Sequence, residues 1–500
     1  MAGTIIDSES YFSRTLQEYL LLPGLVKETI SVDDVDLSVN LTKGEDAIRL
    51  RIPILTAAMQ SVTGDSMATA IARLGGAGVI YCSQPIADEA KLVRNVKRVK
   101  AGFVVPDVLL PSATISDAYE RMRETGYSKF PVTEDGTPTG RLLGLLTDND
   151  FDIDVHASSK VYERMKPLEE LDVAYENEIT DDIKRANRKL REGHHSVLPI
   201  ITSDGRLKSL VFRRDMRAHE DNPYELLDDA KRYAVGAAVN THDYAERAKA
   251  LIDAEADFLV IDTSQGYSEY LEKTLRYLKR EFPHIPVVAG NIVTADGFRF
   301  LVDNGADAVK IGMGSGSICI TQEQIRVGRG QASAVLDVSR ARDSYYSETS
   351  TYIPICSDGG IMSAGDIQVA LALGADYVMA GGYVAGTEES NGPEDVERRE
   401  VDGKWMEVKV KRYWGEGSRK AQEWSGLRYG HTRFEEGFET TVPYTGPLRN
   451  HLMPALAQIR DGIRKSGSSN IPELHANAIL QVMSPLSITL SRGKPATGYR

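Results

Sequence analysis

The chain of 500 residues is poor in cysteine, and this scarcity excludes several structural classes. Its three cysteines, Cys82, Cys319 and Cys356, are too few and too scattered for a disulfide framework. They also lack the close pairs, such as C-x-x-C, that structural zinc sites use. Because unpaired thiols persist in a reducing compartment, we expect a cytoplasmic protein.

Long apolar runs and an excess of basic charge are missing as well. No apolar segment is long enough to cross a bilayer, and no basic stretch followed by an apolar core marks the N-terminus. We therefore expect neither export nor a membrane partner. The net charge of -13 argues against nucleic acid as a partner, although it is compatible with a local phosphate site. No G-x-G-x-x-G turn follows a strand pattern, so a Rossmann domain is not indicated.

Strand and helix patterns alternate along most of the chain. Short apolar runs that end in small or polar residues occur at 52–56, 78–81, 234–239, 258–263, 286–291, 308–312, 354–357 and 377–381. Helical patterns lie between the later runs, at 243–255, 267–282, 297–304 and 364–373. Eight strands alternating with helices predict an α/β fold of the (β/α)8 TIM barrel type, whose chemistry lies on the loops after the strands.

An internal repeat fills the long gap between the second and third apolar runs. Residues 114–151 contain Phe130-Pro-Val-Thr-Glu-Asp-Gly136, and residues 179–217 contain Leu198-Pro-Ile-Ile-Thr-Ser-Asp-Gly205. Each copy predicts the order helix, strand, Asp-Gly turn, strand, helix. The repeat resembles a tandem CBS pair, or Bateman module, inserted at about 104–220 between barrel segments 1–103 and 221–500.

The CBS resemblance implies a nucleotide site. In that family a Thr/Ser-x-x-Asp sequence can hold a nucleotide ribose, and Thr147 with Asp150 matches it, whereas the second copy has Phe212 before Asp215. An adenine or guanine nucleotide is therefore the candidate ligand. The alternative is a module that folds and helps assembly without binding anything, since a fold does not by itself establish a function.

Cys319 ends a turn of small residues, Gly312-Met-Gly-Ser-Gly-Ser-Ile-Cys-Ile-Thr321. Small residues leave backbone N–H groups free to face an anion, and a thiol in such an electropositive setting loses its proton more readily. This placement predicts a nucleophile beside a phosphorylated ligand. The alternative is a small buried hydrophobe, which is the usual state of an unpaired cysteine.

Further motifs follow the cysteine turn. They are Gly328-Arg-Gly-Gln331, Ser357-Asp-Gly-Gly-Ile361, Tyr413-Trp-Gly-Glu-Gly-Ser418, Arg428-Tyr429 and Glu435-Glu-Gly437. In order, and over nearly the whole chain, they resemble the inosine-5'-monophosphate (IMP) dehydrogenase family. The sister family, guanosine monophosphate (GMP) reductase, shares the barrel, the cysteine loop and the phosphate site, so both reactions stay open. A nucleotide-sensing protein with an inactive barrel is a third alternative.

The resemblance implies NAD-dependent oxidation of IMP to xanthosine monophosphate (XMP) and a role for each motif. Cys319 would add to C2 of the purine, while Arg428 and Tyr429 would activate the water that hydrolyses the resulting thioimidate. Thr321 and Glu436 would form an alternative proton-handling pair. Substrate binding is assigned to Met59, Ser317, Asp358, Gly359, Gly360, Gly381, Gly382, Tyr413, Gly415, Glu416, Gly417 and Glu436. NAD binding is assigned to Asp262, Thr263, Asn291, Gly312 and Gly314.

Three further features are implied by the resemblance. The segment at about 413–436 would form a mobile flap that carries the Arg-Tyr dyad. Main-chain carbonyls of Gly314, Gly316 and Cys319 would bind K+ together with a Glu-Gly-Gly tail of another subunit. Here the tail reads Ser487-Ile-Thr-Leu-Ser-Arg-Gly493, so potassium dependence is open. The assembly implied is a homotetramer.

Overall fold

The computed structural model describes residues 4–6, 12–44, 47–99, 107–125, 127–179, 183–193, 196–212, 224–401, 404–424 and 435–491. The chain divides into two compact units. The first joins Met1–Val96 to Ala234–Arg500, and the second is Lys97–Tyr233, which extends further at both ends than the expected 104–220. Within the described residues, no helix has both the length and the apolar character needed to span a membrane.

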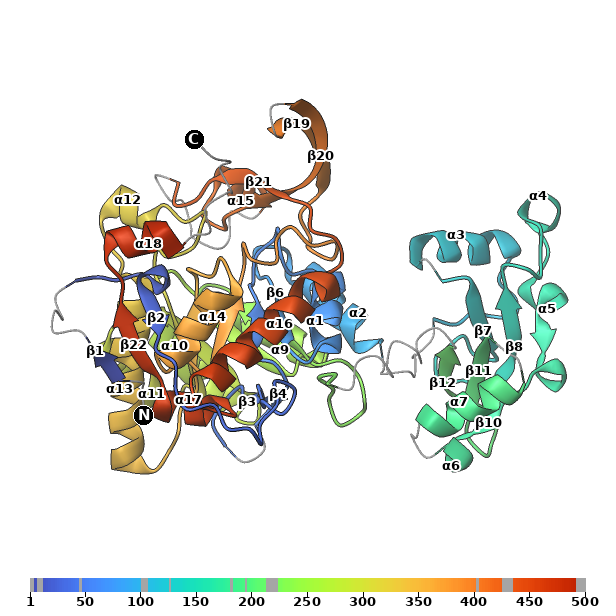
Figure 1. The fold of residues 1–500 in the computed structure, drawn as a ribbon. Coiled ribbons are helices and arrows are strands. Elements are labelled where there is room, and N and C mark those ends of the chain that lie inside the picture. Colours follow the sequence, from blue (N-terminus) through green and yellow to red (C-terminus); the bar gives the residue numbers. More distant parts are fainter. Residues whose placement is uncertain are drawn as a thin grey trace. The chain divides into compact units, whose positions relative to one another are not determined.

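The first unit is built on a closed barrel of eight parallel strands (Figure 1). They are β5 (Ile54–Thr56), β6 (Ala77–Ile80), β13 (Val235–Val239), β14 (Phe258–Asp262), β15 (Val287–Ile292), β16 (Ala308–Ile311), β17 (Ile355–Asp358) and β18 (Tyr377–Ala380). Each strand overlaps one of the eight apolar runs, so the predicted TIM barrel is confirmed. Their side chains are almost all buried, because the outer faces pack under helices and the inner faces fill the barrel.

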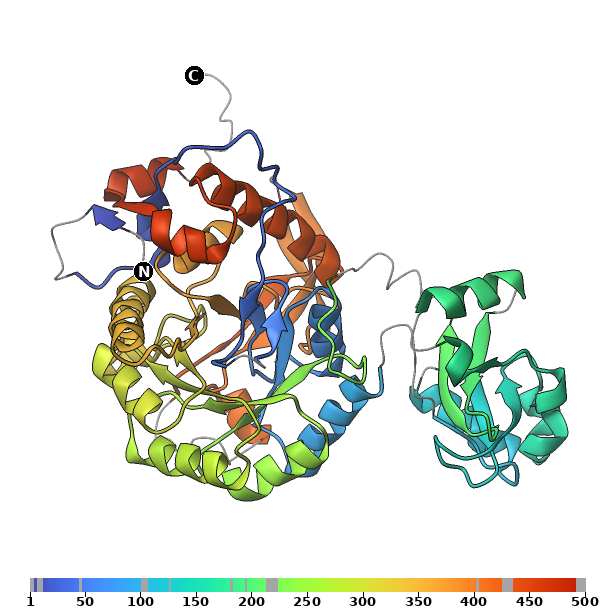
Figure 2. The same ribbon diagram turned by 90° about the horizontal axis from the view of Figure 1, so that it is seen from below.

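A helix follows each barrel strand along the chain, and Figure 2 shows these helices as a ring around the strands. The helices are α1 (Asp65–Arg73), α2 (Ile86–Lys97), α9 (Tyr244–Asp253), α10 (Glu269–Glu281), α11 (Ala295–Asp303), α13 (Gln331–Thr349), α14 (Ala364–Ala372) and α16 (Leu448–Lys465). The side chains of Ser268, Thr294 and Ser363 cap α10, α11 and α14 by accepting a first-turn N–H. The four helices predicted from sequence are confirmed.

Several elements of the first unit were not predicted. They are β1 (Thr4–Ile6), η1 (Leu16–Glu18), β2 (Tyr19–Leu21), β3 (Val39–Asn40), β4 (Arg49–Leu50), α12 (Thr321–Ile325), β19 (Glu394–Val401), β20 (Lys404–Trp414), α15 (Arg419–Trp424), β21 (Glu439–Pro443), α17 (Ile471–Asn477), β22 (Ile479–Val482) and α18 (Pro485–Ser491). Strands β19, β20 and β21 form an antiparallel sheet after the last barrel strand. The segment expected as a flap from 413 begins inside β20, because Tyr413 pairs with Thr440 of β21.

The second unit contains two three-stranded sheets, one for each copy of the repeat. The first copy comprises α3 (Ile115–Thr125), β7 (Lys129–Thr133), β8 (Leu142–Thr147), α4 (Ile153–His156), α5 (Val161–Arg164), β9 (Lys166–Pro167) and η2 (Leu168–Glu170). The second comprises β10 (Ala174–Tyr175), α6 (Glu176–Ile179), α7 (Ile183–Glu192), β11 (Val197–Ile201) and β12 (Leu207–Phe212). Its identity as a CBS pair stays a prediction.

The insertion interrupts the connection from α2 to β13, which runs from a helix to the next strand. The loops that run from a strand to its helix are therefore left intact in this part of the chain. In a TIM barrel those loops carry the chemistry, so the second unit is added without breaking the candidate site.

Candidate active site

One cavity lies where the barrel strands end, and it gathers most of the predicted site residues. Its volume is about 900 Å³ when the solvent at its mouth is included. The predicted residues in its wall are Met59, Asp262, Thr263, Asn291, Gly312, Gly314, Gly316, Cys319, Thr321, Asp358, Gly359, Tyr413, Gly415, Glu416, Gly417 and Glu436. Ser317, Gly360, Gly381 and Gly382 are not in the wall, and Arg428 and Tyr429 lie outside the described residues.

The loop after β16 presents the candidate nucleophile. Cys319 is partly exposed, and its Sγ lies 3.2 Å from the Thr321 hydroxyl oxygen. The Cys319 N–H donates to the Gly316 carbonyl at 3.1 Å, which curls the loop back on itself. Gly312 opens the loop at φ 147°, where an added Cβ would lie 2.0 Å from the Asp358 carbonyl oxygen. Glycine is required there, because a side chain would push the cysteine loop away from β17.

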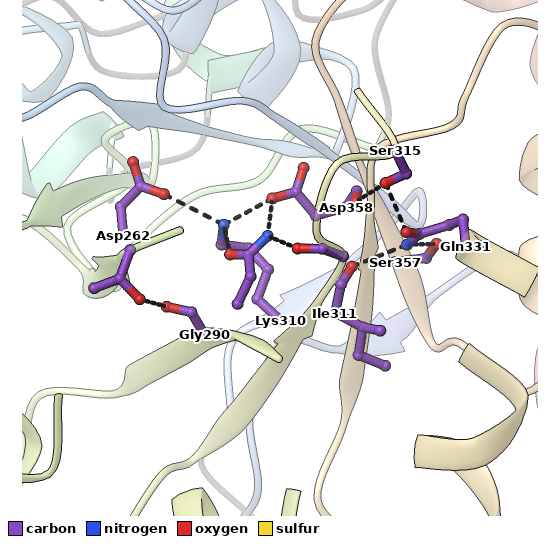
Figure 3. Close-up of polar contacts among 11 residues, drawn as sticks. Asp262, Gly290, Lys310, Ile311, Ser315, Gln331, Ser357 and Asp358 are labelled. Atoms are coloured by element: carbon purple, nitrogen blue, oxygen red, sulfur yellow. Dashed lines mark hydrogen bonds and ion pairs between the residues drawn. The ribbon is translucent and has the colours of Figure 1, made fainter. Parts of the chain in front are cut away.

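Gln331 fixes this loop to two barrel strands (Figure 3). Its side-chain amide donates to the Ile311 carbonyl and to the Ser357 hydroxyl, both at 2.9 Å, and its carbonyl accepts from Ser315 at 2.8 Å. Gln331 is almost fully buried, so leaving these bonds unmade would be costly. The bonds explain why a glutamine ends the Gly328-Arg-Gly-Gln331 motif, for which sequence analysis offered no role.

A buried lysine that sequence analysis overlooked lies between two predicted site carboxylates. The Lys310 Nζ is 2.7 Å from Asp358 Oδ2 and 3.4 Å from Asp262 Oδ1, and it also donates to the side-chain oxygen of Asn291 (Figure 3). Asn291 Nδ2 in turn donates to Asp358 Oδ2 at 2.9 Å. The available signal was a charged residue in the middle of an otherwise apolar strand, β16.

Three predicted substrate-binding residues, Ser317, Gly381 and Gly382, are neighbours although they are not in the cavity wall. A Cβ added to Gly382 would lie 2.8 Å from the Ser317 hydroxyl oxygen and 3.4 Å from the Tyr413 hydroxyl. One added to Gly381 would lie 3.3 Å from the same Tyr413 oxygen. Burial raises the pKa of Tyr413 to about 12, with a hydrogen bond to Ser317 opposing the shift. Tyr413 therefore keeps its proton at neutral pH, and its hydroxyl can donate a hydrogen bond to an anion.

Main-chain hydrogen bonds place Glu436 beside the cysteine loop. The Ile320 N–H donates to the Glu436 carbonyl at 3.0 Å, and the Glu436 N–H donates to the Gly417 carbonyl at 3.1 Å. Cys319 and Gly437 form an isolated antiparallel bridge. The Glu435-Glu-Gly437 motif is therefore hydrogen-bonded to the loop of the candidate nucleophile, although the two segments are far apart in the sequence.

Glu416 links the loop after β20 to two barrel loops. Its carboxylate oxygens accept the Gln60 N–H and the Ser83 hydroxyl, both at 2.5 Å. Trp414 Nε1 also donates to the Gln60 side chain at 3.0 Å. Burial raises the pKa of Glu416 to about 7, against the opposing effect of the Ser83 and Gln60 hydrogen bonds. Gln60 and Ser83, in the loops after β5 and β6, had not been singled out, because neither belongs to one of the motifs recognised in the sequence.

The raised pKa of Glu416 predicts a pH-dependent stability. The unfolded chain loses this proton near pH 4.5 and the folded chain near pH 7, so between these values the folded state holds more protons. Stability must then fall as pH rises through this window. Glu416→Gln cannot ionise, so we expect it to match wild type at about pH 5 and to be more stable by about 3 kcal/mol at about pH 8.

Urea unfolding followed by tryptophan fluorescence would measure this difference. Glu435→Gln, at an exposed position near the same loop, is the control and should show no such change with pH. An equal stability difference between Glu416→Gln and wild type at both pH values would contradict the assignment.

Comparison with known proteins identifies the family. The IMP dehydrogenase / GMP reductase domain model matches residues 13–492. The chain belongs to the IMP dehydrogenase / GMP reductase family. It is 42% identical to the inosine-5'-monophosphate dehydrogenase of Tritrichomonas foetus over 484 residues, which cover 95% of this chain and 94% of that protein. It is 40% identical to the same enzyme of Toxoplasma gondii over 395 residues, 77% of this chain and 68% of that protein.

Solved structures of the sister branch of the family share the fold. A cysteine-to-alanine variant of GMP reductase from Trypanosoma brucei, in complex with guanosine 5'-monophosphate, superposes with a TM-score of 0.83. It is 29% identical and covers 97% of this chain and 98% of its own. Higher sequence identity to the dehydrogenases favours that branch, whereas the shared fold is common to both.

Proposed function

We propose that this chain oxidises IMP to XMP with NAD+. The observation that carries the proposal is the juxtaposition, in one cavity, of the Cys319 thiol, the Thr321 hydroxyl and the Asp358 carboxylate. The identity of 42% to a dehydrogenase over nearly the whole chain supports it. The cavity is lined by glycines, whose main-chain N–H groups can face an anion, and by the candidate nucleophile Cys319, and this supports a phosphorylated purine as the ligand.

The first step makes a covalent bond to the purine. The Cys319 sulfur adds to C2 of IMP, because C2–H is a poor hydride donor until a nucleophile has added there. NAD+, when bound, accepts the hydride that leaves C2. The carbon then stays bonded to sulfur as a thioimidate. Thr321 lies close enough to Cys319 to take part in moving the thiol proton.

The second step hydrolyses this bond. Water adds to C2, sulfur leaves, and the products are XMP and the free thiol. We assign water activation to Arg428 and Tyr429 and an alternative proton path to Thr321 with Glu436. Glu436 is held beside Cys319 by main-chain bonds, which supports that assignment. Arginine is normally protonated, so its use as a base demands a strongly perturbed site.

The residues assigned to the cofactor fit a nicotinamide riboside. Asp262 ends β14, Thr263 follows it, and both line the same cavity as Gly312 and Gly314. The Thr263 hydroxyl donates to the Gly290 carbonyl at 2.8 Å, so its oxygen is left as an acceptor for a ligand hydroxyl.

The second candidate is GMP reductase, whose solved structure from Trypanosoma brucei shares the fold of this chain. It would use Cys319 on GMP, release ammonia with help from Thr321 and Glu436, and take hydride from NADPH. Absorbance of reduced nicotinamide separates the two reactions. With purified protein we expect a rise with IMP and NAD+, accompanied by XMP, and no fall with GMP and NADPH. If absorbance instead fell with GMP and NADPH and did not rise with IMP and NAD+, the chain would be a reductase and not a dehydrogenase.

The same assay tests the finer proposals. Carbonyls of Gly314, Gly316 and Cys319 would hold K+, so replacing K+ by a larger cation should lower the rate. Among the described residues, no cluster of acidic, histidine or cysteine side chains could hold a metal ion.

A nucleotide bound near Thr147 and Asp150 should change the rate of NADH formation when ATP or GTP is added. Light scattering of the same sample tests the proposed homotetramer.

A further inference from the structure

Lys310 places a buried ammonium group in the wall of the cavity. It is 2% exposed and projects from β16, between β15 and β17. A lysine ammonium has three N–H donors, and here three side-chain oxygens accept from it, on Asp262, Asn291 and Asp358. All of its hydrogen-bonding capacity is therefore used by the protein. Lys310 has no donor left for a ligand, so any effect on binding must act through these neighbours.

The three acceptors come from strands that carry different predicted roles. Asp262 ends β14, on the side assigned to the cofactor, whereas Asp358 ends β17, on the side assigned to the substrate. Figure 3 shows the lysine nitrogen between the two carboxylates. Two carboxylates that share a cavity repel each other, and one buried cation between them offsets that repulsion.

The contacts also leave one oxygen of Asp358 for a ligand. Both Lys310 and Asn291 Nδ2 donate to Asp358 Oδ2, at 2.7 and 2.9 Å. No side chain or main chain within the described residues donates to the other carboxylate oxygen, Oδ1. The two donors to Oδ2 thus set the orientation of the Asp358 carboxylate, while Oδ1 can accept a hydrogen bond from a ligand hydroxyl. Fixing an acceptor in this way lowers the ordering cost of binding.

We propose that Lys310 is a positioning residue: its ammonium, together with the Asn291 amide, holds the Asp358 carboxylate where it receives the substrate ribose, and ties it to Asp262 on the cofactor side. The inference rests on the proposed function, because it takes Asp358 as the ribose acceptor. Without the ammonium, Asp262 and Asp358 would repel each other and Asp358 would lose one of its two donors.

Calorimetric titration of IMP into the full chain without NAD+ tests this directly. Lys310→Met should weaken IMP binding about tenfold or more, and Lys310→Arg, which keeps the charge and the donors, should stay within about threefold of wild type. Lys97→Met is the matched control. Lys97 is equally buried and pairs with Asp228 at 2.8 Å, but it lies outside the cavity wall, so its loss should lower stability and leave IMP binding unchanged.

A double-mutant cycle separates positioning from a general structural effect. Asp358→Asn should weaken IMP binding about tenfold or more in wild type, but by less than about threefold in Lys310→Met, where Asp358 is already misplaced. Should Lys310→Met not fold, Lys310→Gln, which removes the charge but keeps a donor, replaces it. The proposal would be overturned if Lys310→Met or Lys310→Gln bound IMP with wild-type affinity. It would also be overturned if Asp358→Asn weakened IMP binding equally in wild type and in the Lys310 variant.

The outcome for wild type keeps the two proposals apart. A wild-type chain that binds IMP, together with a Lys310→Met variant that binds it equally well, removes only the role of Lys310. A wild-type chain that does not bind IMP removes the proposed function, and the inference about Lys310 falls with it.

Discussion

Cys319→Ala should abolish NADH formation from IMP, lowering kcat by about a thousandfold or more, because it removes the sulfur that forms the bond to C2. IMP binding should persist, since the substitution removes one sulfur from the cavity wall. Stopped-flow absorbance measures the first effect and calorimetry the second. Alkylation gives a second measurement. Iodoacetamide should label Cys319 in wild type, and bound IMP should slow this labelling.

The two other cysteines provide the controls. Cys356 is fully buried on β17, and burial raises the pKa of its thiol well above the usual value, so it stays protonated and unreactive. Cys82 is also buried. Cys356→Ala and Cys82→Ala should keep kcat within about threefold of wild type. Turnover by Cys319→Ala within tenfold of wild type would refute covalent catalysis.

Arg428→Ala should separate the two chemical steps. If Arg428 activates water, hydride transfer continues while hydrolysis slows, so we expect a burst of NADH of one equivalent per active site. Steady turnover should then be slower by about a hundredfold or more. Acid quenching during the slow phase, followed by mass spectrometry of the Cys319 peptide, should show the trapped purine adduct. A reductase has no hydrolytic step and would give no such burst.

Arg419 is the matched control for this experiment. It lies in α15, is 80% exposed in its side chain and pairs with Glu435 at 3.6 Å. An exposed ion pair contributes little, so Arg419→Ala should leave both the burst and the steady rate near wild type. If Arg428→Ala gave no burst of NADH, Arg428 would act before hydrolysis. If Arg428→Ala and Arg419→Ala changed the steady rate equally, the role of Arg428 in water activation would be refuted.

Much of the candidate site was visible in local patterns. Cys319 and Asp358 each follow an apolar strand in a turn of small residues, and parallel strands bring such turns to one end of a barrel. Tyr413 shows the limit of this reasoning. Its glycine-rich surroundings predict a loop, but pairing with β21 places it in a buried strand. Tertiary pairing overrides local preference wherever a distant segment supplies the partner.

The sequence alone predicted the barrel, the approximate position of the second unit and the candidate nucleophile. These follow from the spacing of apolar runs and from the conformations that small residues permit, which are properties of neighbouring residues. The tertiary structure decided the partners of Lys310, Gln331 and Glu416. The Glu416 carboxylate bonds Gln60 across 356 residues and Ser83 across 333 residues. The cost of burying a charge depends on such distant partners, so only the folded chain sets the pKa of Glu416 and joins Asp262 to Asp358 through one ammonium.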